Sequence, residues 1–299
     1  MRNDIKEIIV HDGTFHCDDV SVVALMKMMN PQITIRRLDR NHLPKEETEG
    51  TIIADIGYGK YDHHQADAFV DDRGHKYAAI GLVLRDYKDL IYPEGVPGDL
   101  VQIVHDIEDI DNGVSVPEDR IGACISKIVE SYLPAWYEQQ LPEILDTRFL
   151  QAMNFVKENV FIPFQQSLTM PEANKQALYD RYDYYLDRKE KADSLAKKAI
   201  IKAYAESRDN IVVLSQSMPW EELLADTEAK YVIYPSNRGG YNLQCVPLPG
   251  DLFSQKQPLP EEWLRELPDG CIFVHTARFL AAFETEDTAY NAAKKLIGE

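Results

Sequence analysis

The sequence predicts an α/β protein built from three successive parts. Short β-branched runs alternate with helical patterns over residues 1–115, which is typical of a parallel sheet with helices on its faces. Helical periodicity dominates residues 116–208, and short strand-like runs return over residues 209–299. A length of 299 residues is sufficient for two hydrophobic cores. We therefore expect a parallel-sheet amino-terminal domain, a helical connecting region and a smaller mixed α/β carboxy-terminal domain, divided at these boundaries.

Three apolar runs in the amino-terminal part favour strands, and three periodic segments favour helices. The strands are predicted at 8–10, 33–35 and 51–54, where isoleucine, valine and threonine dominate. The helices are predicted at 20–28, 79–91 and 100–107, where apolar residues recur at helical spacing. Ligands of a parallel sheet bind beyond the carboxyl ends of its strands. His11 and Asp55 directly follow two of these strands, so both are candidates for a functional site.

The rest of the chain predicts one long helix and a sheet of mainly antiparallel strands. The helix is expected at 188–208, and we interpret its basic residues as a solvated face, with the wall of a nucleic-acid groove as the less favoured alternative. Strands are expected at 211–214, 230–235, 242–246 and 271–275, with a turn at 236–240. Thr285 is expected to cap a closing helix that ends near Leu296.

Composition argues against several classes of protein and partner. With 32 basic and 50 acidic residues the net charge is −18, which opposes non-specific nucleic-acid binding and long duplex DNA as a partner. The four cysteines form no Cys-x-x-Cys pair, which excludes a zinc ribbon and indicates a reducing compartment. The sequence shows no run of 18 apolar residues and no signal peptide. We expect a cytoplasmic protein without membrane contacts, and a homodimer remains open.

Imidazole and carboxylate groups concentrate in the first 64 residues, at the ends of the apolar runs. Imidazole nitrogens and carboxylate oxygens are the ligand set of divalent transition metals, and a carboxylate between them lets two ions share one site. The sequence therefore predicts a dinuclear metal centre that activates water. Its members are His11, His16, Asp18, Asp55, Asp62, His63 and His64.

The motifs around these residues resemble those of a known family. They read HDGTFHCD at 11–18, DIG at 55–57, YDHHQ at 61–65 and DNG at 111–113. In this order and spacing they resemble the melanocyte proliferating gene family of metal-dependent hydrolases and exonucleases, a branch of the DHH phosphoesterase superfamily. Later segments, MPW at 218–220, LQCVP at 243–247 and GCIFVH at 270–275, are similar to further motifs of that family. The resemblance covers essentially the whole chain and makes the amino-terminal part a DHH-type domain.

The resemblance implies a hydrolase with two divalent ions, usually manganese, and a shared aspartate. His11, His16 and Asp55 would hold one ion, and Asp18, Asp55, His63 and Asp111 the other. Asp111 precedes Asn112-Gly113, a helix stop, and is therefore expected in a loop. Adjacent residues of an extended chain point in opposite directions, so we expect only His63 to ligate. His64 is then expected to contact the scissile phosphate as a catalytic residue, and Asp62 to orient a neighbouring histidine.

Two departures from the superfamily pattern affect the metal and the substrate. The first motif reads His-x4-His-x-Asp instead of His-x3-Asp-x-Asp. A neutral imidazole in place of a carboxylate favours manganese, iron or zinc over magnesium. Near the end of the chain, Ala281-Ala282-Phe283 stands where related proteins carry a Gly-Gly-His substrate-binding element. His275 and Arg278 are the candidates to replace it.

These observations leave three functions open. The leading prediction is a manganese-dependent exonuclease that trims single nucleotides from short RNA or DNA. The second is a hydrolase of small phosphoesters such as a dinucleotide, a pyrophosphate or a nucleoside phosphate, which the acidic net charge favours. The third is a metal-stabilised regulatory protein without turnover, for which the altered carboxy-terminal element is the argument.

Overall fold

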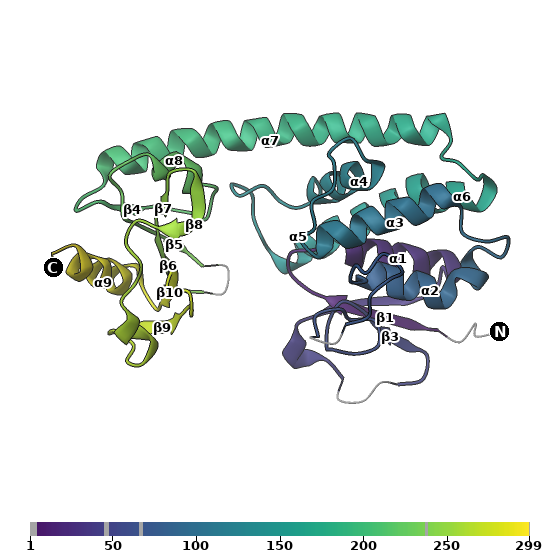
Figure 1. Cartoon of the computed structure of the whole chain (residues 1–299), viewed down its shortest axis with the longest axis horizontal. Helices are drawn as coiled ribbons and strands as arrows, with labels where there is room; N and C mark the ends of the chain where they lie inside the picture. Colours follow the sequence, from purple (N-terminus) through teal and green to yellow (C-terminus); the bar gives the residue numbers. More distant parts are fainter. Residues whose placement is uncertain (1–4, 45–47, 66–67, 237–238, 299) are drawn as a thin grey trace. The chain divides into compact units, whose positions relative to one another are not determined.

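The computed structural model describes residues 5–44, 48–65, 68–236 and 239–298 (Figure 1). The chain divides into two compact units, each with its own core. The first unit comprises residues 1–134 and 138–188, and the second comprises 135–137 and 189–299. Helix α7 (Glu172–Glu206, 35 residues) contributes to both units. The expected connecting region, 116–208, is largely helical and is likewise shared between the two units.

A parallel sheet of three strands forms the base of the first unit. The strands are β1 (Glu7–His11), β2 (Thr34–Leu38) and β3 (Thr51–Ile53), in the order β2-β1-β3. Ile8 of β1 lies opposite Ile35 on one side and Ile52 on the other. Side chains alternate along β1: Ile8 faces the main core, whereas Ile9 packs in a small cluster with Ile53 and Ile56. The predicted parallel sheet is therefore confirmed.

Helices on one face of this sheet supply most of the core of the first unit (Figure 1). Helix α1 follows β1 and buries almost every side chain from Cys17 to Met26, so it is the central helix. Helix α1 contacts α2, α3, α4 and α5, which explains its unusually apolar circumference. The helices and short helical turns of the unit before α7 are α1 (Cys17–Met29), η1 (Arg40–His42), α2 (Ala79–Ile91), α3 (Gly98–Asp111), α4 (Ile121–Glu130), α5 (Pro142–Val156), η2 (Lys157–Phe161) and α6 (Pro163–Gln166).

A mixed sheet of five strands forms the second unit. Its order is β4-β5-β6-β10-β9, with one parallel pair, β4 with β5, and antiparallel pairs elsewhere. A short hairpin of two further strands follows β6. The strands are β4 (Ile211–Val213), β5 (Tyr231–Pro235), β6 (Tyr241–Cys245), β7 (Pro247–Leu248), β8 (Asp251–Gln255), β9 (Cys271–Val274) and β10 (Leu280–Phe283).

Helices cover both faces of the mixed sheet. Helix α9 (Glu286–Gly298) packs Ala289 and Ala293 against Tyr231 and Phe283 on one face, beside the short turn η3 (Glu261–Leu264). On the other face, the last turns of α7 and the short helix α8 (Glu221–Ala225) pack against Val212 and other strand residues. Among the described residues, no helix is both long and apolar enough to cross a membrane.

Several local expectations are confirmed and others are corrected. Thr285 caps α9 by accepting a hydrogen bond from the Thr288 amide at 3.2 Å. The expected turn at 236–240 joins β5 to β6, and its residues Asn237 and Arg238 lie outside the described residues. The long helix begins at Glu172 instead of near 188. Strands β7, β8 and β10 were not predicted, because their short runs lack a clear alternating pattern.

Candidate metal centre

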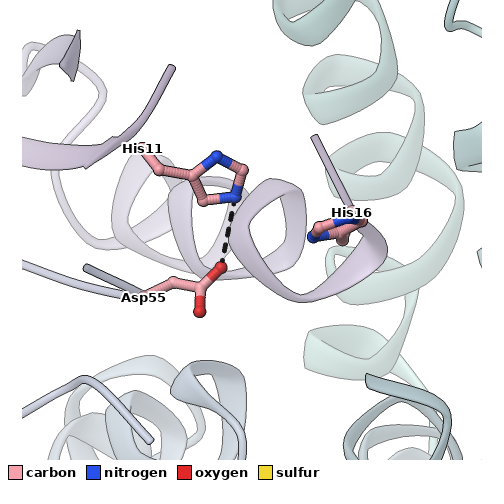
Figure 2. A group of neighbouring side chains, drawn as sticks. All are labelled: His11, His16 and Asp55. Carbon is pink, nitrogen blue, oxygen red and sulfur yellow. Dashed lines mark ion pairs between the residues drawn. The ribbon is translucent and has the colours of Figure 1, made fainter. Parts of the chain in front are cut away.

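The first half of the candidate centre lies at the carboxyl end of β1. His11 is the last residue of β1, and its Nε2 atom lies 3.3 Å from Oδ2 of Asp55. His16 directly precedes α1, and its ring lies 5.6 Å from that of His11. Figure 2 shows His11 and Asp55 pointing toward one another, with His16 beside them at the start of the helix. The potential ligand atoms of all three residues lie within 4.8 Å of one another.

Asp55 occupies its position because the chain turns sharply after β3. Its φ angle is 57°, in the left-handed region that aspartate tolerates better than most residues. The Asp55 amide donates a hydrogen bond to the Tyr61 carbonyl at 2.9 Å, and Gly57 continues the turn with φ 91°. A side chain added at Gly57 would come within 2.8 Å of Leu43. Backbone strain of this kind is held in place by its surroundings and is common at functional sites.

Asp55 also belongs to the second half of the centre. There it is joined by Asp18, His63 and Asp111, whose potential ligand atoms also lie within 4.8 Å of one another. The Nε2 atom of His63 lies 3.1 Å from Asp55 and 3.0 Å from Asp111. Asp111 is the last residue of α3, so its expected place in a loop is wrong. The helix end nevertheless aims its carboxylate at His63.

Asp18 has a structural role in addition to its place in this group. Its side chain is fully buried, and its two oxygens accept hydrogen bonds from the Ala79 and Ile80 amides at 3.0 and 2.7 Å. Asp18 therefore caps the start of α2, a helix distant from it in sequence. Burial, followed by repulsion from Asp111 and Asp55, raises the pKa of Asp18 well above its usual value. A cation near these carboxylates would oppose that shift.

Asn112 fixes the orientation of the His63 ring, a role that sequence reasoning missed. Its Oδ1 atom accepts a hydrogen bond from Nδ1 of His63 at 3.3 Å. Its Nδ2 atom donates to the Glu108 and Lys76 carbonyls at 2.9 and 3.1 Å. With Nδ1 occupied as a donor, Nε2 is the nitrogen that faces Asp55 and Asp111. A ring held through one nitrogen and open at the other is the usual arrangement of a metal-binding histidine.

His64 and Asp62 are placed as the sequence suggested, with one correction. Asp62 is buried, and its Oδ1 atom lies 2.6 Å from Nδ1 of His64 while also accepting from the His64 amide. Asp62 thus orients His64. The His63 and His64 rings lie side by side, 4.3 Å apart, so the expected opposite orientation is wrong. The backbone is not an extended strand there, and both rings lie near Asp55.

Asp19, like Asn112, is a residue of the site that the sequence motifs did not single out. One of its oxygens caps α1 by accepting from the His16 and Val20 amides at 2.8 and 2.9 Å. The other oxygen, Oδ2, is buried without a hydrogen-bond partner and lies 3.4 Å from Nε2 of His11. Burial raises the pKa of Asp19 to about 6. An uncompensated buried carboxylate oxygen beside a histidine fits a site made to receive a cation.

The charges of the two halves also fit divalent ions. Burial would lower the pKa of His11, but the adjacent Asp55 and Asp19 carboxylates raise it to about 9. In the same way burial opposes the charged form of His63, while hydrogen bonds to Asp111 and Asp55 raise its pKa to about 11. The carboxylates therefore draw protons onto the nitrogens that would otherwise face a metal. Imidazole and carboxylate together suit Mn²⁺, Fe²⁺ or Zn²⁺.

A separate acidic group, which does not include Asp55, differs from those around Asp55. Potential ligand atoms of Asp71, His105 and Glu108 also lie within 4.8 Å of one another. Here, however, the Arg73 guanidinium donates to Asp71 at 2.6 Å and lies 3.9 Å from Glu108. The cluster already contains its own positive charge, so we assign it no metal.

The substrate-binding candidates of the second unit have local partners. His275 and Arg278 lie in the turn between β9 and β10. His275 Nδ1 accepts from the Ala277 amide at 3.1 Å, and Arg278 donates to the Leu259 carbonyl at 3.2 Å with φ 59°. Residues 281–283 belong to β10, where Ala281 and Phe283 are fully buried. Their roles in substrate binding stay predictions.

The chain as a whole matches a known family. Residues 7–297 match the MYG1 exonuclease family model, which is described as an uncharacterised protein family, UPF0160. The MYG1 protein of Saccharomyces cerevisiae is 25% identical over 344 residues, covering 97% of this chain and 95% of the yeast protein. The proteins named MYG1 exonuclease in Mus musculus and Homo sapiens are 25% and 24% identical, covering 97% of this chain and 84% and 85% of their own lengths.

The match over most of the chain therefore places it among proteins whose mouse and human members are named exonucleases. The chain belongs to the MYG1 family, which confirms the resemblance seen in its motifs. A solved structure of similar fold is that of PggH from Vibrio cholerae, named a pGpG-specific phosphodiesterase. The TM-score is 0.51 at 13% identity, and the match covers 98% of both chains. At that identity the likeness concerns the fold.

Proposed function

We propose that this protein is a metal-dependent exonuclease that acts on short RNA or DNA with two divalent ions, of which Mn²⁺ is the preferred one. The observation that carries the proposal is the shared position of Asp55 in three overlapping groups of potential ligands. One group adds His11 and His16, one adds Asp18, His63 and Asp111, and one adds His63 and His64. A carboxylate common to two such groups is the arrangement that bridges a pair of ions.

Side chains around the proposed ions would bind the substrate and orient the ligands. When bound, a pair of divalent ions supplies a nucleophilic hydroxide and offsets the charge of the phosphate. Asp62 orients His64, whose half-exposed side chain would contact the scissile phosphate. Asn112 holds His63 in place through Nδ1. The names of the mouse and human relatives support this function, and the net charge of −18 disfavours long duplex DNA as its substrate.

A test of this proposal needs purified protein stripped of metal by a chelator and then given Mn²⁺ or Mg²⁺. We expect oligonucleotides labelled at either end to lose single nucleotides in Mn²⁺ and more slowly in Mg²⁺. His63→Ala should abolish this activity. The exposed His42, which pairs with Asp39, provides the matched control His42→Ala, which should keep full activity. Absence of product from the wild type, or equal activity of His63→Ala, would exclude the proposal.

A second candidate function keeps the centre and changes the substrate to a small phosphoester. The net charge of −18 favours it, because the 50 acidic residues, which outnumber the 32 basic ones, repel a long nucleic-acid backbone. Comparison of dinucleotides with oligonucleotides of about twenty residues separates the two functions. Faster turnover of the dinucleotide would favour the small-molecule function.

A further inference from the structure

A cavity of about 670 Å³ opens beside the candidate metal centre, within the first unit. Cavities of this size hold small organic ligands, whose sites span about 300–1,000 Å³. Its walls come from the start of α1, the end of α3, the loop that follows α3, one side of α4 and the first half of α7. Three of the candidate metal ligands, His16, Asp18 and Asp111, belong to its lining.

Helical periodicity explains why the two main walls face the cavity. Ala123, Ser126, Lys127 and Glu130 recur along one face of α4 at spacings of three and four residues. Ile107, Ile110 and Asp111 do the same on α3, which packs against α4. Asp111 therefore marks the end of an apolar wall and the beginning of the metal centre. A molecule bound in the cavity would extend from the metal centre onto this wall.

The side chains that line the cavity suit an uncharged ligand with apolar faces and a polar edge. Apolar side chains such as Ile107, Ile110 and Val114 provide the walls, and the hydroxyl groups of Ser115, Ser126 and Tyr182 provide hydrogen-bonding positions. The Ser126 hydroxyl can serve only as an acceptor, because it donates to the Gly122 carbonyl at 3.0 Å. Lys127 is paired with Glu130 at 3.1 Å, and Glu118 adds a further negative charge. The lining away from the metal ligands thus offers little to a second phosphate. A planar base joined to a sugar has the matching combination of apolar faces and polar edges.

We propose that this cavity binds the nucleoside of the nucleotide whose phosphate lies at the metal centre, so that the enzyme recognises one terminal nucleoside. The inference rests on the proposed phosphodiester hydrolysis and names the part of the substrate that gives specificity. The phosphate would lie at the end lined by His16, Asp18 and Asp111, and the base would lie between α3 and α4. Length beyond this nucleoside contributes little to recognition within the cavity.

Two esters with the same leaving group test the proposal. They are thymidine 5′-(p-nitrophenyl phosphate) and methyl p-nitrophenyl phosphate, hydrolysed by the Mn²⁺-loaded protein. In each case water adds to phosphorus, the bond to p-nitrophenolate breaks and a proton is released. We expect wild-type kcat/KM to favour the thymidine ester by about 10-fold to 100-fold, because even one methylene group bound in an apolar pocket contributes about 10-fold or more to kcat/KM. The only difference between the esters is the nucleoside.

Variants of the cavity wall localise this preference. Ala123→Phe fills the cavity and should lower kcat/KM for the thymidine ester about tenfold or more, while the methyl ester changes less than about twofold. Ser126→Leu, on the same wall, gives an independent variant with the same expected pattern. Leu90→Phe adds a phenylalanine at an exposed position of α2 and should leave both esters unchanged. Thermal melting of each variant confirms that it is folded.

The outcomes separate failure of the cavity from failure of the enzyme. If the wild type cleaves neither ester, the proposed hydrolysis is wrong, and the nucleoside site is wrong with it. If the wild type cleaves both esters equally well, the hydrolase stands and the nucleoside site is refuted. The same conclusion follows if the folded wall variants slow both esters to the same extent. Selective loss of the thymidine ester supports the site.

Discussion

Replacement of Asn112 by alanine removes the side chain that orients His63. The substitution deletes the acceptor for His63 Nδ1 and the donor to the Glu108 and Lys76 carbonyls. Loss of a group that orients a metal-binding histidine lowers metal affinity by about 10- to 100-fold. At about 1.4 kcal/mol per tenfold, this corresponds to about 1.4–2.8 kcal/mol of Mn²⁺ binding free energy. Separately, loss of the hydrogen bonds to these carbonyls should lower the free energy of unfolding of the metal-free protein by about 1 kcal/mol.

Calorimetric titration of Mn²⁺ into metal-free protein measures this effect. Asn112→Asp keeps an oxygen acceptor for His63, loses the donor to the Lys76 and Glu108 carbonyls and adds a negative charge, so its Mn²⁺ affinity should stay near that of the wild type or above it although its fold is less stable. Asn159→Ala provides a control, because it also removes an asparagine that donates to a backbone carbonyl, that of Phe155. Asn159 lies in η2 and is not one of the candidate metal-site residues. Equal Mn²⁺ affinity of wild type and Asn112→Ala would refute the role given to Asn112.

Three further predictions concern other parts of the first unit. Asp19→Asn keeps an acceptor for the start of α1 but replaces the unpartnered oxygen beside His11, so Mn²⁺ affinity should fall about tenfold in the same titration; unchanged affinity would contradict this. Gly81→Ala would place a methyl group 1.7 Å from Glu108 Oε1, so urea unfolding should show a loss of about 1–3 kcal/mol, whereas Gly98→Ala, with open space around it, should cost nothing. Burial raises the pKa of Glu108 to about 8 despite the nearby Arg73, so the folded state holds a proton that the unfolded state releases above pH 4.5. The free energy of unfolding should therefore fall as the pH rises from 5 to 8, by on the order of 2–4 kcal/mol; Glu108→Gln should remove this part of the pH dependence, and parallel curves for the two proteins would refute it.

Much of the fold and of the centre could be predicted from the sequence because the relevant signals are local. The apolar runs before His11 and Asp55 define β1 and β3, and residues at the ends of parallel strands meet at one edge of the sheet. The resemblance of the motifs to those of the family then adds Asp18, His63 and Asp111, which the structure brings to within 4.8 Å of Asp55.

The missed features depend on contacts that are distant in sequence or on the local path of the backbone. Asn112 predicts only a helix stop, because its bond to His63 spans 49 positions. The partly polar first half of α7 has few fully buried residues, Leu178 and Tyr185 among them, so it lacks an apolar stripe of clear period. The paired orientation of His63 and His64 follows from an irregular backbone that the sequence pattern does not indicate.

The two hydrogen bonds that Asp18 accepts from α2 limit which amino acids can replace aspartate at position 18. Asparagine would turn an NH₂ group toward one of the two amide donors, and glutamate would add a methylene group to a fully buried side chain. Aspartate alone supplies two acceptors of the right reach together with a negative charge. His16 is exposed at the N-cap position of α1 and is not buried as Asp18 is, so exchange of ligand type is easier there. Divergence of the first motif within such proteins should therefore concentrate at position 16 and spare position 18.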